Sequence, residues 1–460
     1  MARRLKPTGH GCLMRLLAAQ RRRAILRKAQ PVDRVAFSFL RKLMALSLEL
    51  PVVQRWACRS CGECCKRHLV EITTDERDRI LAQGWEHDPV LHGSQTVVPV
   101  SRLSKRWRLN HTSDGSCVFL NADGLCRIHA KFGETAKPLA CRVYPYAFHP
   151  SGKKIAVSLR YSCPSVVENY GQTSLEAEKS IRQIAKAVVP DRHRETPPPA
   201  VSAGNPLGWT DFRKFVDALE ASVSASTPDF LRRLLGTIFW ISLVDQASFA
   251  KIRAARVDEF LSLIRPAAAA EVPQDLSEFS KPSAVGHMMF RLLVGQYAKL
   301  ETTADLHHPW QTRWRNITGS VRLTRGKGLL PPLRAELRPV PFDALEQPFG
   351  WPEAADELFS RYFQTKIRGM HFCGRAYYGV PFAEGFFALA LVVPVTLYLA
   401  RWLAVGDGRT SISNGDVYAA LAMVDHHHGY SPFFGGASAR SRVRTLAKGD
   451  LPKLCVWYSR

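Results

Sequence analysis

Apolar residues recur at helical spacing through most of the second half of the chain. Phe230, Leu234, Leu235, Ile238 and Ile241 lie three or four residues apart, as one face of an α-helix requires. Similar patterns predict further helices near residues 247–264, 283–299, 352–368, 383–405, 414–428 and 437–447. The stretch 305–350 is rich in Pro, Arg and Trp and shows no clear period. Residues 209–460 are therefore predicted to form a mainly α-helical domain.

One helix of this half is unusually apolar. Residues 385–400 carry no charged side chain, are bracketed by Glu384 and Arg401, and contain Pro394. A helix that spans a bilayer needs about 20 apolar residues. The run is shorter than that, so it predicts a buried core helix kinked at Pro394, and no transmembrane anchor is expected.

The first half is patterned differently, with short alternating segments and frequent turn residues. Thr73 and Glu76 have the spacing of a capping box, which predicts a short helix through about Leu81. Residues 97–103 alternate weakly, as a strand does. Residues 143–149 and 153–161 flank a turn signal and predict a β-hairpin. These features indicate a small α+β domain.

The predicted fold class is thus α+β, with a small cysteine-rich domain followed by a mostly helical one. The cysteine-rich domain is placed at residues 51–190, and the helical domain at 209–460. Between them, residues 191–208 contain three consecutive prolines and read as a linker. With 460 residues, the chain is long enough for two or three buried cores.

The distribution of charge predicts a basic N-terminal arm and an anionic partner. Residues 1–50 hold twelve Lys and Arg but only two acids, which predicts a basic helical arm. The arm either meets an anionic surface or packs on the body with its arginines in water. The formal net charge of +24 favours an anionic partner, namely nucleic acid, an acidic protein or an anionic membrane surface.

Cysteine is the residue type that points to chemistry. Eight of the eleven cysteines fall within residues 58–163, and no secretory signal is evident, so a cytoplasmic location is expected. A reducing compartment disfavours structural disulfides, and clustered cysteines then indicate metal ligands. The candidate ligands are Cys58, Cys61, Cys64, Cys65, Cys117, Cys126, Cys141 and Cys163, with His129 as a candidate nitrogen ligand.

The cysteine spacing leaves the kind of centre open. Two-residue gaps let a turn wrap one metal, and Gly62 permits the tight backbone. The adjacent side chains of Cys64 and Cys65 are expected to diverge. This suggests two metal centres, one cluster with a spare thiol, or one larger bridged cluster. Sulfur ligands suit both zinc and an iron–sulfur cluster.

The ordered motifs resemble the CxxCxxCC family of zinc- or iron-chelating domains. The resemblance covers about residues 55–165 and rests on these motifs: Cys58-x-x-Cys61-x-x-Cys64-Cys65, Cys117-x-Phe-Leu, Cys126-x-Ile-His129, Lys137-Pro138 and Cys141-Arg-x-Tyr-Pro. It implies metal binding. The family includes flagellin lysine-N-methylases, which use S-adenosylmethionine, so it also implies methyl transfer to a protein substrate. A flagellin-like or other acidic protein would be compatible with the net charge of +24.

Two alternatives come from other functional classes. One is a non-catalytic binding module stabilised by zinc, and the other is a basic nucleic-acid-binding protein. The residues themselves give little support for methyl transfer, because no Gly-rich strand–turn–helix marks a dinucleotide-type cofactor site. The run Asp425-His426-His427-His428 is interpreted as the end of a helix, with cationic imidazoles near its C-terminal dipole. No catalytic residue and no oligomeric state follow from the sequence.

Overall fold

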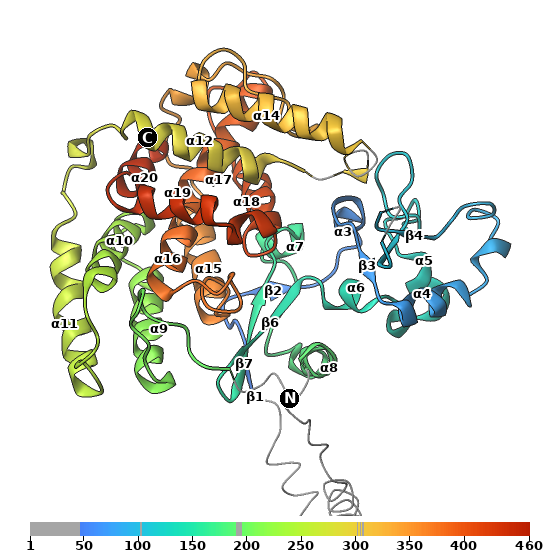
Figure 1. The fold of residues 1–460 in the computed structure, drawn as a ribbon, viewed down its shortest axis with the longest axis horizontal. Coiled ribbons are helices and arrows are strands. Elements are labelled where there is room, and N and C mark those ends of the chain that lie inside the picture. Colours follow the sequence, from blue (N-terminus) through green and yellow to red (C-terminus); the bar gives the residue numbers. More distant parts are fainter. Residues whose placement is uncertain (1–46, 102–103, 190–195, 301, 304, 306–307) are drawn as a thin grey trace, which may run out of the picture. The chain divides into compact units, whose positions relative to one another are not determined.

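Short strands in the first part of the chain form small sheets, and helices fill the rest (Figure 1). The computed structural model describes residues 47–460 except 102–103, 190–195, 301, 304 and 306–307. Leu48–Arg460 forms one compact unit. The fold class is α+β, as predicted. The predicted arm lies almost wholly outside the described residues, and the predicted domain boundaries stay predictions.

The strands of the described residues form three sheets, in the orders β1-β7-β6, β2-β8 and β3-β5-β4. In chain order they are β1 (Ser47–Glu49), β2 (Arg55–Trp56), β3 (Glu71–Ile72), β4 (Val97–Pro99), β5 (Trp107–Leu109), β6 (Tyr146–Ser151), β7 (Lys154–Leu159) and β8 (Gln172–Thr173).

The predicted hairpin is present. β6 and β7 pair antiparallel from Tyr146 opposite Leu159 to Ser151 opposite Lys154. Its two-residue turn begins at Gly152, whose positive φ of 65° suits glycine. Five of the six residues of β7 are buried, because the strand packs against the helical part of the unit at α15 (Ala355–Arg368). The hairpin therefore joins the two regions.

Short helices separate the strands of the cysteine-rich region. They are α3 (Glu63–Arg67), α4 (Thr74–Leu81), α5 (Arg127–Phe132), α6 (Leu139–Val143), α7 (Pro164–Val167) and α8 (Glu178–Val188). The predicted capping box starts α4, because Thr73 accepts from the Glu76 backbone and Glu76 accepts from the Thr73 backbone. The Glu76 carboxylate also accepts from the Leu139 backbone N–H, so this cap positions α6 as well.

Long helices make up the second half. Besides α15 they are α9 (Trp209–Ser224), α10 (Phe230–Gln246), α11 (Ala255–Ala270), α12 (Ala284–Ala298), α14 (Pro309–Arg325), α16 (Phe382–Ala390), α17 (Val392–Gly406), α18 (Asn414–His427), α19 (Ala437–Ala447) and α20 (Leu451–Ser459). All seven helices predicted from periodicity are present, although the one predicted at 383–405 is divided into α16 and α17. The prediction near 247–264 begins too early, since α11 starts only at Ala255.

The apolar run lies in the core. Phe382–Gly406 is the one helical stretch in the described chain that is long and apolar enough to cross a bilayer. Its most apolar part is 94% buried inside the protein. The break falls at Leu391, between α16 and α17, and not at Pro394 itself. The ring of a proline clashes with the carbonyl four residues before it, so the helix is interrupted upstream of Pro394.

Candidate metal centre

The first two cysteines lie in a tightly turned loop. Cys58 and Cys61 are exposed between β2 and α3. Ser60 has a φ of 56°, and Gly62 has a φ of 71° at the N-cap of α3. Glycine adopts this left-handed conformation without the steric cost that a Cβ brings. Gly62 therefore has the role that the sequence indicated.

The turn between Cys117 and Cys126 packs directly on this loop. A Cβ placed on Gly124 would lie 2.0 Å from the carbonyl oxygen of Ser60, so only glycine allows the approach. The Cys117 N–H donates to the Cys65 carbonyl at 2.8 Å. Cys126 pairs with Leu120 across the turn. These contacts bring the turn between Cys117 and Cys126 against the segment that carries the first four cysteines.

Four thiols, called here the inner thiols, gather beneath this loop: Cys64, Cys117, Cys126 and Cys141. Burial raises the pKa of Cys117 to about 12, and charge on Cys141, Cys126 or Cys64 would raise it further. Cys141 behaves alike: burial raises its pKa to about 12, and Cys126 and Cys64 add to the effect. The inner thiols are thus electrostatic neighbours, although they come from four separate segments.

Cys64 and Cys65 both face this group. Their sulfur atoms lie 3.9 Å apart, so the predicted divergence of the two adjacent side chains is wrong. Both residues belong to one short helix, α3. The contact with Cys65 and then burial raise the pKa of the Cys64 thiol. Cys65 also packs against the small apolar core beside Cys126 and Cys141.

The remaining predicted ligands are Cys58, Cys61, Cys163 and His129. Cys163 is buried at the N-cap of α7, where burial raises its pKa and charge on Cys61 raises it further. Cys61 and Cys163 are therefore neighbours, and Cys58 belongs to the same loop as Cys61. His129 is exposed on the first turn of α5. Charge on Cys163 and on Cys64 would both raise the pKa of Tyr144, so this tyrosine lies near both Cys163 and the inner thiol Cys64.

The donor chemistry fits a thiophilic metal. Burial and the neighbouring thiols raise the pKa of these cysteines, so they resist ionisation. A bound dication lowers the pKa again, because it coordinates the thiolates. Among the described residues, no group of three or more His, Cys, Asp or Glu side chains is arranged to hold an ion as it stands.

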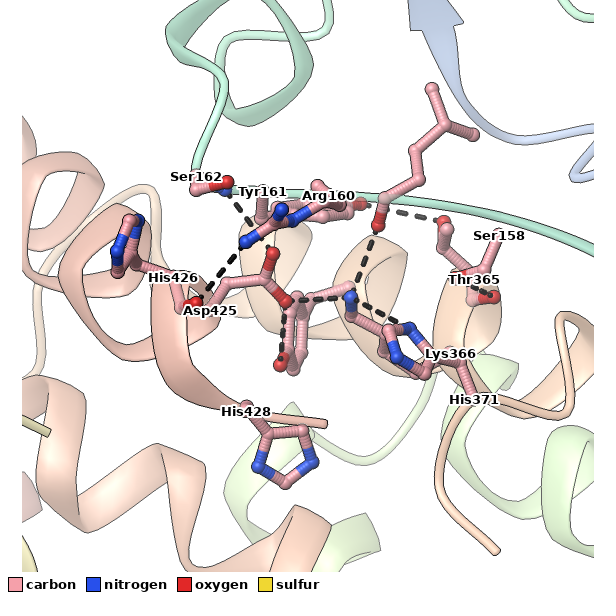
Figure 2. A network of polar contacts seen from close by, with 12 residues as sticks. Ser158, Arg160, Tyr161, Ser162, Thr365, Lys366, His371, Asp425, His426 and His428 are labelled. Atoms are coloured by element: carbon pink, nitrogen blue, oxygen red, sulfur yellow. Dashed lines mark hydrogen bonds and ion pairs between the residues drawn. The ribbon is translucent and has the colours of Figure 1, made fainter. Parts of the chain in front are cut away.

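A buried polar network that the sequence did not indicate lies between the hairpin and the helices (Figure 2). The Lys366 ammonium on α15 pairs with the Asp425 carboxylate on α18 at 2.6 Å, and both side chains are fully buried. Lys366 also donates to the Leu159 carbonyl at 3.0 Å, while Tyr362 donates to Asp425 at 3.2 Å. Burial lowers the pKa of Lys366, and Asp425 opposes that shift.

This network reaches the segments that carry cysteines. Asp425 accepts from the backbone N–H of Ser162, the residue before Cys163, at 3.2 Å. Arg160 donates to the His426 carbonyl at 3.1 Å, and the His426 ring stacks on His68, which caps the end of α3. The end of α18 therefore contacts the segments that carry Cys163 and the first four cysteines. Only long-range contacts define this arrangement, so no local sequence signal could have found it.

The histidine run does end a helix, but its imidazoles are not cationic. α18 ends at His427, with His428 as its C-cap. Burial lowers the pKa of His427 to about 4 and that of His428 to about 3. His427 contacts the Lys299 carbonyl, and His428 contacts the Tyr297 hydroxyl at 2.9 Å. The cost of burying a charge outweighs the attraction of the helix dipole, so the rings are neutral.

Comparison with known proteins agrees with the cysteine pattern. No curated protein and no solved structure matches the chain. A family model does match, over residues 57–164, and its description is "CxxCxxCC: Putative zinc- or iron-chelating domain". The match spans the eight clustered cysteines and the hairpin. Residues 57–164 are thus a domain of the CxxCxxCC family of zinc- or iron-chelating domains.

Proposed function

We propose that this protein binds zinc or iron through its cysteine thiolates, with Cys64, Cys117, Cys126 and Cys141 as the principal ligands. The convergence of these four thiols from four separate segments carries the proposal. Cys117 is buried and the other three are half-buried, and an uncomplexed thiolate is costly in such surroundings. Sulfur donors select zinc or iron–sulfur clusters over calcium and magnesium, which prefer oxygen ligands.

A second centre at Cys58, Cys61 and Cys163 is part of the proposal. Cys61 and Cys163 influence each other electrostatically, and Cys58 lies in the same exposed loop as Cys61. Cys65 lies 3.9 Å from Cys64 and supplies a fifth thiol at the principal site. Three protein ligands leave a coordination position open, which is typical of sites that bind a further ligand, whereas four thiolates close a structural site.

The first experiment measures metal and acid-labile sulfide on protein purified without oxygen. Iron with sulfide and visible absorbance would identify an iron–sulfur cluster, whereas zinc with a colourless protein would identify a thiolate zinc site. The absence of both metals, in a folded protein with reactive thiols, would refute the proposal.

Alanine variants then assign the ligands. Cys117→Ala and Cys141→Ala are expected to remove the metal of the principal site, and Cys163→Ala only that of the second centre. Cys455→Ala is the matched control, since Cys455 is equally buried but lies in α20. Loss of metal in Cys455→Ala, or its retention in Cys117→Ala, would contradict this assignment.

Methyl transfer and nucleic-acid binding stay predictions, and each has a direct test on the metal-loaded protein. Calorimetric titration with S-adenosylmethionine tests for a methyl-donor site, and a gel shift across a salt series tests for nucleic acid. Binding through phosphate contacts weakens steeply as salt rises. A protein that binds neither ligand would fit a metal-stabilised binding module.

A further inference from the structure

Helix α14 carries an apolar stripe on its outer face. Trp310, Trp314, Ile317 and Val321 are spaced by four, three and four residues, so they share one side of the helix. They are exposed by 72%, 66%, 46% and 43% respectively. Single exposed apolar residues are ordinary, but a continuous row with two tryptophans marks an interaction site.

The stripe points away from the protein. The opposite side of α14 is buried at Gly319 and Leu323, and Leu323 packs so closely on α12 that a Cβ at Gly295 would lie 2.3 Å from it. α14 thus uses its other face to attach to the body, beside α12 (Figure 1). The exposed row is left without a partner within the part of the chain that the structure describes.

Positive charge borders the stripe. α14 has four arginines and no acidic residue. Arg315 pairs with Asp305. Arg313, Arg322 and Arg325 are exposed and make no ion pair with any described residue, and the exposed Lys327 follows them. The partner of this face must therefore accept both indole rings and a row of cations.

We propose that α14 docks the protein on an anionic membrane surface. An interfacial helix lies in the plane of the bilayer with its apolar side in the boundary between headgroups and acyl chains. Tryptophan prefers this boundary, because its ring is apolar and its N–H is polar. Arginines beside the stripe then meet anionic headgroups. This surface is separate from the cysteine domain, so the proposal does not depend on the metal.

Vesicle binding by the full-length protein tests this inference. Wild-type protein is mixed with phosphatidylcholine vesicles, with or without phosphatidylglycerol, and bound protein is separated by flotation. Trp310→Ala/Trp314→Ala is expected to weaken binding to the anionic vesicles by about tenfold or more. Arg313→Gln/Arg322→Gln/Arg325→Gln is expected to remove most of the preference for anionic over neutral vesicles.

Matched variants separate this helix from other exposed apolar and cationic side chains of the protein. Leu263→Ala removes another exposed apolar side chain, which lies on α11 and is 66% exposed. Lys251→Gln/Arg256→Gln/Lys448→Gln removes three exposed cations elsewhere. Both controls are expected to bind as the wild type does. Equal binding by the double-tryptophan variant would overturn the proposal. So would a wild-type dimer that this variant converts to a monomer, since a second copy would then occupy the stripe.

Discussion

At the scale of single residues, Gly124 shows how backbone contacts shape the cysteine site. Its φ is 77°, and the Ser60 carbonyl leaves no room for a Cβ. Gly115 has a similar φ of 84°, but a Cβ at this position would have no other atom within 4 Å. The two glycines therefore separate the cost of a left-handed backbone from the cost of a clash.

Gly115→Ala is expected to destabilise the protein by about 1 kcal/mol, the ordinary cost of a left-handed alanine. Gly124→Ala has the same backbone cost, and its Cβ in addition displaces the loop that carries Cys58 and Cys61. It is expected to cost more stability and to lower metal content. Urea unfolding and metal analysis of both variants check this prediction. Equal effects of the two substitutions would show that the contact with Ser60 does not organise the site.

At the scale of elements, the Lys366–Asp425 pair connects α15 to α18 and both to the hairpin. Breaking a fully buried pair by removing one partner typically costs about 3–5 kcal/mol, because the other charge is left uncompensated. Lys366→Met and Asp425→Asn are each expected to cost this much in the free energy of unfolding. The double variant is expected to cost clearly less than the sum, since it removes both charges.

A double-mutant cycle by urea unfolding measures this coupling. The matched control is the exposed pair of Lys214 and Asp258, whose charged atoms also lie 2.6 Å apart. Coupling in that pair should stay below about 1 kcal/mol, because water screens exposed charges. Additive effects at Lys366 and Asp425 would mean that the buried pair does not join the elements.

Element prediction succeeded where the determining signal is local. The Thr73–Glu76 box begins α4, and α19 spans the predicted residues 437–447, because caps and periodic apolar positions act within a few residues. α14 was missed within the stretch 305–350. Its row of Trp310, Trp314, Ile317 and Val321 has helical spacing, but neighbouring Pro and Arg residues obscured the period.

At the scale of the whole molecule, the site was only partly predictable. Cysteine spacing identified the domain, since ligands of one metal tend to lie close along the chain. Spacing could not show which thiols become neighbours, because Cys141 and Cys163 reach theirs through tertiary contacts. The Lys366–Asp425 pair lies outside any motif, and its partners come from distant segments.

Buried neutral histidines make the whole fold sensitive to acid. Burial lowers the pKa of His149 and of His428 to about 3, whereas an unfolded histidine titrates near about 6.5. Below that pH the unfolded chain binds protons that the folded protein does not bind, so the free energy of unfolding decreases as the pH is lowered. Each such histidine contributes a loss of about 1.4 kcal/mol per pH unit between these two values.

His428→Asn is expected to make unfolding less dependent on pH, although it lowers stability at neutral pH. Asn keeps a polar atom near the Tyr297 hydroxyl but takes up no proton in this range. Urea unfolding from pH 7 to pH 5 gives the slope for each protein. Acid also displaces metal from thiolates, so the decisive quantity is the difference between variant and wild type at equal metal content. The exposed His92→Gln should leave the slope unchanged. If His428→Asn also left it unchanged, His428 would take up its proton equally in the folded and unfolded states, and the buried ring would not be a source of acid sensitivity.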